Sequence, residues 1–151
     1  MFFVPGEMVG LWFDFIPSEK PYFYGDGYPI LPTLKGHEYV DYNKELYPLI
    51  RPKYAERGLH GSVNVATFVR EYANFGYPGL ILSSLFLAVF LYFLEKLFAD
   101  SLTILISMNL IYLLLLSSSN LFTILFSGGW LVLISLYFIF KSTLLKSVQS
   151  K

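Results

Sequence analysis

Two long stretches without charge dominate the pattern of hydrophobic and polar positions. No Asp, Glu, Lys or Arg lies between Glu71 and Glu95, and none lies between Asp100 and Lys141. Uncharged apolar stretches of about 18 residues or more are typical of segments that cross a lipid bilayer. The pattern therefore predicts an all-α integral membrane protein with about three C-terminal transmembrane helices, at residues 78–94, 102–116 and 121–140.

The preceding residues, 1–76, have a different pattern. They hold seven of the eight prolines and turn motifs such as SEKP and GDG, which predicts a loop-rich segment with short extended pieces at residues 22–24 and 38–42. The first 16 residues are mostly apolar, but one proline, two glycines and two acids interrupt them, and we interpret them as an interfacial or loop segment with aromatic anchors. A polar segment without an export signal suggests that further helices precede it in a longer protein.

A short amphipathic helix is predicted within residues 61–76. Ser62 or Asn64 is a candidate N-cap, Gly76 is expected to end the helix, and Pro78 suits the first turn of the next one. Apolar side chains recur at helical spacing along this segment and predict one buried face. They are Val65, Phe68, Val69, Tyr72 and Phe75.

Charge predicts the orientation. The C-terminal end carries Lys141, Lys146 and Lys151 without any acid, so residues 142–151 are expected to form a cytoplasmic tail. Three spans, within residues 77–141, then place residues 1–76 on the periplasmic or extracellular side. The formal net charge of zero gives no indication of a nucleic-acid partner.

The composition also limits the chemistry. The chain has no Cys, which excludes disulfides and thiol catalysis, and His37 and His60 are too far apart in sequence to form a zinc motif. We therefore predict no metal site and no cofactor.

Two stretches carry a resemblance to a known family. They are MFFVPGEMVGLWFDFI at the start and NVATFVREYANFGYPGLILSSLFLAVFLYFLEKL at residues 64–97. Together they resemble the C-terminal part of oligosaccharide repeat-unit polymerases of the O-antigen polymerase type. Members of that family tend to have an Arg just before the aromatic segment, whereas this chain begins there with Met1.

The resemblance implies a multi-pass protein of the inner cell membrane that acts in surface polysaccharide synthesis. Such enzymes are glycosyltransferases that move a polyprenyl-pyrophosphate-linked oligosaccharide chain onto the next lipid-linked repeat unit. The expected partners are this lipid-linked glycan, membrane lipid, and upstream helices or partner membrane proteins. A related glycan ligase and a non-catalytic, membrane-anchored binding or assembly subunit of a polysaccharide export system are the alternatives.

The resemblance implies that loop arginines, and not a metal, stabilise the leaving pyrophosphate. The candidates are Arg51, Arg57 and Arg70, with Lys53 as a further phosphate-binding cation. Arg suits this role because its planar guanidinium binds two phosphate oxygens at once. The alternative is that these cations are solvated or bind lipid headgroups. His60 lies in the same cluster and is a candidate general base or an ordinary loop histidine.

Other side chains are candidates for binding the glycan. Asp14 lies between aromatic residues, and Glu71 follows Arg70, with which it can also form a surface ion pair. Aromatic residues offer either a sugar-stacking platform or a membrane-interface belt, and the belt is the commoner use. They are Trp12, Phe13, Tyr22, Phe23, Tyr24 and Tyr28. Within the predicted spans, Asn109, Asn120 and Thr123 are expected to form hydrogen bonds between helices, and the Gly128–Gly129 pair to let helices approach closely.

Overall fold

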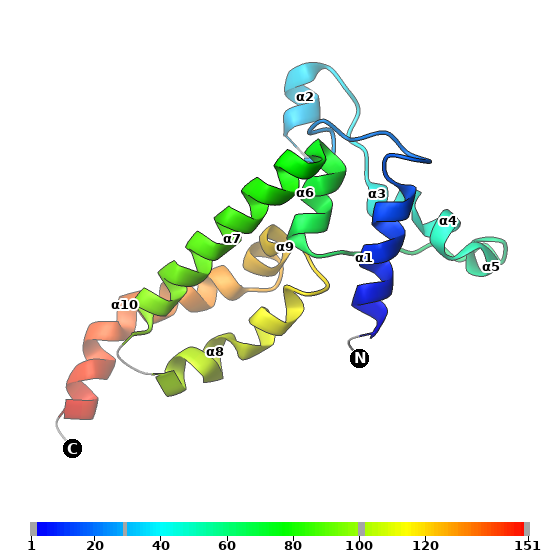
Figure 1. Ribbon diagram of the computed structural model, residues 1–151. Helices are drawn as coiled ribbons and strands as arrows, with labels where there is room; N and C mark the ends of the chain where they lie inside the picture. The colour runs from blue at the N-terminus through cyan, green and yellow to red at the C-terminus, as the bar shows by residue number, and fades with distance from the viewer. Residues whose placement is uncertain (1–2, 29, 100–101, 150–151) are drawn as a thin grey trace. The chain divides into compact units, whose positions relative to one another are not determined.

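The computed structural model describes the backbone of residues 3–28, 30–99 and 102–149, and the side chains of these up to residue 141, starting at Pro5. Within these residues all regular secondary structure is helical (Figure 1). The chain forms two compact units, Met1–Leu87 and Ala88–Lys151. The all-α prediction is confirmed.

The first unit begins with a helix that the sequence did not predict. Helix α1, Phe3–Phe15, replaces the expected interfacial or loop segment. Pro5 lies in the first turn, where a missing backbone N–H costs nothing. Met8, Trp12 and Ile16 follow at intervals of four and are buried, so they form the helix face that packs on the protein core.

Four short helices follow α1. They are α2 (Leu31–Lys35), α3 (Tyr42–Glu45), α4 (Tyr47–Ile50) and α5 (Pro52–Ala55). Proline lies in the first turn of α2, α4 and α5, and the Asp41 side chain caps α3 by accepting from the N–H of Asn43. The segment is rich in turns, as predicted.

The expected extended pieces form no strands. The N–H groups of Phe23 and Tyr24 instead donate to the carbonyls of Ala73 and Asn74, at distances of 2.9 Å each. These bonds attach the loop after α1 to the end of helix α6 (Thr67–Phe75). Residues 38–41 have no regular structure.

Helix α6, Thr67–Phe75, is the predicted amphipathic helix. It ends at Gly76, which has a φ of +67°, as expected. The predicted caps are wrong, because Ala66 occupies the N-cap position and no side chain caps the helix. Ser62 and Asn64 precede this position. Both lie in irregular chain before the helix.

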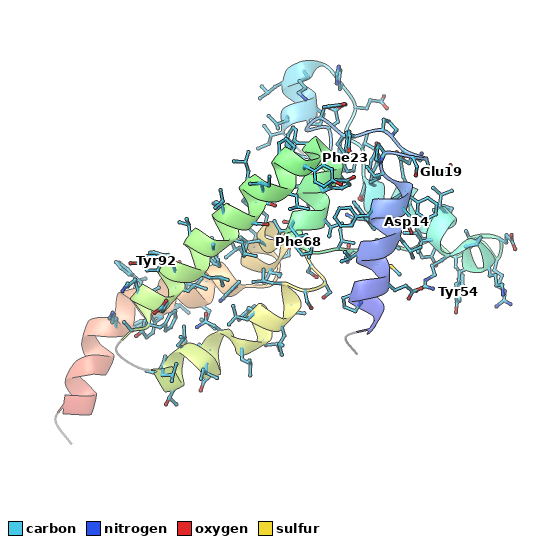
Figure 2. All side chains as sticks on the ribbon, in the orientation of Figure 1. Asp14, Glu19, Phe23, Tyr54, Phe68 and Tyr92 are labelled. Carbon is cyan, nitrogen blue, oxygen red and sulfur yellow. The ribbon has the colours of Figure 1, made fainter. Side chains whose placement is uncertain are left out.

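Helix α6 packs against α1, and this pair forms the centre of the first unit. Val69 and Ala73 are fully buried at the contact, and the rings of Phe13 and Tyr72 lie 4.4 Å apart between their centroids. Phe23, labelled in Figure 2, packs on the ring of Tyr42 in α3. The core therefore joins segments that lie far apart in the sequence.

Helix α7, Tyr77–Leu97, follows directly after Gly76. Pro78 lies in its first turn, as predicted. Among the described residues, this is the one helix long and apolar enough to cross a membrane; the mean hydropathy of its apolar window is 2.0. Helix α7 corresponds to the span predicted at residues 78–94, and it continues three residues further at its C-terminal end.

The second unit contains α8 (Leu102–Leu115), α9 (Leu121–Phe126) and α10 (Trp130–Gln149). The stretches Leu102–Leu115 and Trp130–Lys141 are apolar but shorter than a full span. At 1.5 Å per residue, α8 is about 21 Å long. The second predicted span thus corresponds to α8 alone.

The third predicted span is wrong as a continuous helix, because it is broken after Phe126. Gly129 has a φ of +78°, which ordinary residues rarely adopt, and a Cβ on Gly128 would overlap with the carbonyl oxygen of Ile124. The glycine pair therefore ends α9 and redirects the chain into α10. This role differs from the predicted one, in which the glycine pair lets two helices approach closely.

Among the polar residues of the second unit, Asn109 forms the predicted hydrogen bond between helices. The buried indole N–H of Trp130 donates to the side-chain oxygen of Asn109 at 2.7 Å, which joins α10 to α8. Tyr112 stacks on the Trp130 ring at 5.3 Å between centroids. Asn120 caps α9 by accepting from the N–H of Phe122, so it acts within one helix and not between two.

Replacing Asn109 by Ala is expected to destabilise the second unit by about 1 kcal/mol, because the buried indole N–H of Trp130 loses its acceptor. The free energy of unfolding in detergent measures this loss. Ser107→Ala is the control, since Ser107 is an exposed residue of the same helix. Equal stability of both variants would contradict the role of this hydrogen bond.

Candidate functional site

The first unit contains an open cavity of about 620 Å³ on the side of α3, α4 and α5. Lys44 comes from α3, Tyr47 and Pro48 from α4, and Ala55 from α5. The loop after α5 closes the wall. It contributes Leu59, His60, Gly61 and Ser62.

Local sequence explains how this cavity forms. Gly58, with a φ of +73°, ends the turn after α5, and the N–H of Leu59 bonds back to the carbonyl of Tyr54 at 3.1 Å. The chain then passes so close to Tyr47 that a Cβ on Gly61 would overlap with its ring. The N–H of Val63 donates to the carbonyl of Asn43 at 2.9 Å and fastens this loop to α3.

Lys44 brings a positive charge to the cavity wall. The Lys44 ammonium lies 3.9 Å from Asp41, and its side chain is 76% exposed, so the charge is accessible to a ligand. Lys53 and Arg57 are exposed, and within the described residues their side chains contact no carboxylate. An anionic ligand can therefore bind these cations without first breaking a strong ion pair.

A second group of polar side chains surrounds Arg70 of α6, and it includes Tyr28 and Glu71. Arg70 donates from Nη2 to the carbonyl oxygen of Gly27 at 2.6 Å, and its guanidinium carbon lies 5.8 Å from the centroid of the Tyr28 ring. The hydroxyl of Tyr28 donates to the Glu71 carboxylate. These contacts attach the 27–28 loop to α6, which is a structural role.

Burial changes the acidity of this cluster. It raises the pKa of the Glu71 carboxyl above its ordinary value of 4.5, while the hydrogen bond from Tyr28 and the charge of Arg70 act against this rise. Burial and the neighbouring Glu71 together raise the pKa of the Tyr28 hydroxyl. Glu71 is 8% exposed, so the predicted surface ion pair with Arg70 is wrong.

The raised pKa of Glu71 predicts how stability depends on pH. Its contribution to stability is fully present below the ordinary pKa of 4.5 and is lost as the pH rises through the folded-state pKa. Glu71→Gln, which stays neutral, should therefore gain stability relative to wild type as the pH increases from about 4 to 8. Denaturant unfolding at each pH measures the difference. A difference that instead shrinks with pH would mean that Arg70 stabilises the ionised carboxylate more than burial opposes it.

The three candidate arginines are not brought together. Arg51 lies between α4 and α5 and is 3.5 Å from Glu7 of α1, whereas Arg70 contacts the 27–28 loop. Arg57 follows α5, is exposed, and donates its backbone N–H to the carbonyl of Tyr54. Arg51 and Arg70 thus bind groups of the protein itself. Among the described contacts the Arg57 side chain has no such partner, so its guanidinium is available to a ligand.

The glycan-binding candidates are also separated. Trp12 is 1% exposed and belongs to the core, so neither a sugar-stacking platform nor a membrane belt includes it. Its indole Nε1 has no hydrogen-bond partner among the described residues. Phe23 is buried as well. Asp14, labelled on α1 in Figure 2, is exposed, and its carbonyl accepts from the Ser18 hydroxyl.

His60 is the sequence candidate that lies in the wall of the open cavity beside α3–α5. His37 lies elsewhere, 3.2 Å from Asp26. Sequence reasoning missed Lys44, Tyr47 and Ser62. Their only signal is a location within 16 residues of His60, because the bond between Asn43 and Val63 that joins the two sides has no sequence signature. In the part of the chain that the structure describes, no cluster of three His, Asp or Glu side chains suits a metal ion.

Comparisons with protein families, with characterised proteins and with solved structures find no match to this chain. The resemblance to repeat-unit polymerases therefore rests on the motif residues of the sequence.

Proposed function

We propose that this protein is a multi-pass protein of the cell membrane that binds polyprenyl-pyrophosphate-linked oligosaccharide and forms part of a membrane glycan polymerase. Helix α7 supports the membrane placement by its length and its apolar surface. Helices α8 and α10 add shorter apolar stretches, which suit spans that are completed by flanking residues or by a thinner bilayer. The lysines of the tail favour a cytoplasmic C-terminus and an external location for residues 1–76.

The cavity beside α3–α5 is the observation that carries this proposal. Its volume of about 620 Å³ lies within the range of small-molecule sites, and it suits one or two sugar rings better than a whole repeat unit. Tyr47 offers an aromatic face to the apolar side of a sugar ring. Lys44 lines the cavity and Lys53 and Arg57 follow on nearby turns, which provides cations for a pyrophosphate.

The group transfer then has a defined balance. The acceptor hydroxyl oxygen forms the new glycosidic bond, and the bond between the donor sugar and its pyrophosphate breaks. The hydroxyl proton goes to a base, for which His60 in the cavity wall is the candidate. The pyrophosphate leaves with the electron pair of the broken bond and stays attached to its lipid carrier. Cations stabilise the charge that develops on this leaving group. Upstream helices or partner membrane proteins would enclose the lipid part of the substrate.

A specific observation favours a second candidate, a non-catalytic binding or assembly subunit. Arg51 is 3.5 Å from Glu7 and Arg70 is bonded to Gly27, so two of the three candidate catalytic arginines already hold protein groups. A chain that binds lipid-linked glycan for a separate enzyme needs the cavity but not a base.

Deleting the gene and complementing it with variants tests the proposal. The length ladder of the host's surface polysaccharide, seen on gels, should collapse on deletion and return with wild type. Lys44→Ala and Arg57→Ala should shorten the ladder, whereas Lys20→Ala, which removes a lysine paired with Glu45 outside the cavity, should not. A normal ladder in the deletion strain would refute the proposal.

His60→Ala separates the two candidate functions. Loss of polymerisation with unchanged binding of the lipid-linked substrate would favour the polymerase. Unchanged polymerisation would favour the non-catalytic subunit, because a protein that only binds needs no base at this position.

A further inference from the structure

An exposed apolar surface lies where α6 turns into α7. Ile30 and Leu34 of the α2 region are 72% and 76% exposed, and Tyr77 at the start of α7 is 70% exposed. Soluble monomeric proteins rarely expose large apolar side chains in one contiguous patch, and such a patch usually marks an interaction site. We name this patch the corner surface, and it consists of Tyr24, Ile30, Leu31, Leu34, Phe75 and Tyr77.

The side chains of the corner surface belong together. Gly25 lies at its centre, because a Cβ at this position would be 3.3 Å from Leu31 Cδ1 of α2 and 3.8 Å from Phe75 Cζ of α6. Figure 1 shows α2 beside the turn between α6 and α7. The surface therefore combines three segments of the first unit and is not a set of scattered residues.

A row of aromatic rings connects Tyr24 and Tyr77 of the corner surface through the half-buried Tyr22 and the buried Tyr72. The ring of Tyr22 lies 6.1 Å from that of Tyr24 and 5.8 Å from that of Tyr72, and Tyr72 lies 5.5 Å from Tyr77, all between centroids. Tyrosine is enriched at the boundary between lipid and water, because its ring is apolar and its hydroxyl is polar.

The corner surface continues onto α7. The first turns of this helix expose Ile81, Leu82, Leu85 and Phe86, which form the outer side of the candidate membrane span. One cation, Lys35, borders the surface; its ammonium donates to the carbonyl of Tyr24 and lies 3.5 Å from Asp26. An apolar surface that starts on α2, carries tyrosines and passes into a membrane-length helix fits one partner, the boundary region of a lipid bilayer.

We propose that the corner surface lies in the interfacial layer of the membrane beside the start of α7, so that α2 is a membrane-contacting helix and the first unit is held at the bilayer by its own surface. This requires α7 to cross the membrane but does not require binding of a lipid-linked glycan. Its failure and that of the proposed function are therefore distinguishable.

The absence of Cys from the chain allows a direct test. Leu34→Cys and Glu56→Cys are labelled with an NBD fluorophore, and the full chain is reconstituted in vesicles of phosphatidylcholine and phosphatidylglycerol. Glu56 is an exposed residue after α5, which lies outside the corner surface. Both positions are exposed, so neither label should disturb packing, and the near-ultraviolet circular dichroism spectrum checks this.

The label at Leu34 should emit at shorter wavelength, be quenched by doxyl-labelled lipids, and be quenched severalfold less by iodide than the label at Glu56. Equal iodide quenching at both positions would overturn the proposal. A Leu34 label shielded from iodide and from doxyl lipids alike would also overturn it, because this result would mean that protein covers the corner surface.

Discussion

Replacing Gly79 by Ala is expected to destabilise the first unit by about 2 kcal/mol, although the same change in an open helix stabilises it. Gly79 is the third residue of α7, and a Cβ there would overlap with the carbonyl oxygen of Glu71 in α6. The absence of a side chain therefore lets α6 and α7 pack closely at the Gly76 turn. A methyl group would push the two helices apart and disturb the core contacts of Tyr72.

Gly10→Ala provides the matched control. Gly10 lies in the middle of α1, and a Cβ there would meet no atom within 4 Å. Alanine should stabilise the helix at this position by about 0.5–1 kcal/mol, because it lowers the conformational entropy of the unfolded chain. Thermal unfolding in detergent, followed by circular dichroism, compares the two variants. Stabilisation by both changes would show that α6 and α7 do not pack in this way.

Replacing Trp12 by Ala is expected to cost about 3–5 kcal/mol of unfolding free energy, which is most of the stability of a typical unit of this size. Trp12 is among the largest fully buried side chains and lies in the core formed by α1, α3 and α6. Its removal would leave a cavity among the other large side chains of this core, such as Ile16, Phe23 and Tyr72.

Two further variants separate this packing effect from other causes. Trp12→Phe should cost much less, because it keeps most of the apolar volume and removes an indole N–H that has no partner among the described residues. Asp14→Ala, at an exposed position of the same helix, should change stability by less than about 0.5 kcal/mol. Denaturant unfolding provides the measurement. A Trp12→Ala variant as stable as Asp14→Ala would exclude Trp12 from the core.

The sequence predicted the elements whose signals are local. The stripe from Val65 to Phe75 gave α6, and Gly76 and Pro78 marked the turn into α7, because glycine and proline act on the residues directly around them. The charge-free stretch between Glu71 and Glu95 gave α7 itself.

Helix α1 was missed because its glycines and Pro5 suggested an interrupted segment. Pro5 lies in the first turn and Gly10 has open space around it, so neither breaks the helix. The burial of Trp12 depends on Tyr42 and Tyr72, which lie far away in sequence. A local pattern contains no information on such contacts, and tertiary packing determines the result.

The cavity was found only in part for the same reason. His60 was a candidate from its position in a basic cluster, but Lys44 and Tyr47 reach the same cavity through the link between Asn43 and Val63. The arginines show the opposite case. Their side-chain type suggested one shared anion site, whereas Arg51 and Arg70 contact different protein groups, Glu7 and the carbonyl of Gly27.

Binding of polyprenyl-pyrophosphate-linked oligosaccharide by the purified full chain in lipid nanodiscs tests the central claim most directly. Gly61→Val is the decisive variant, since its side chain would overlap with the Tyr47 ring and reshape the cavity, and Gly10→Ala is its control. Wild type and Gly10→Ala should bind saturably and with equal affinity, and Gly61→Val should bind about tenfold more weakly with unchanged helix content. Equal binding by Gly61→Val, or no saturable binding by wild type, would contradict the assignment of the cavity.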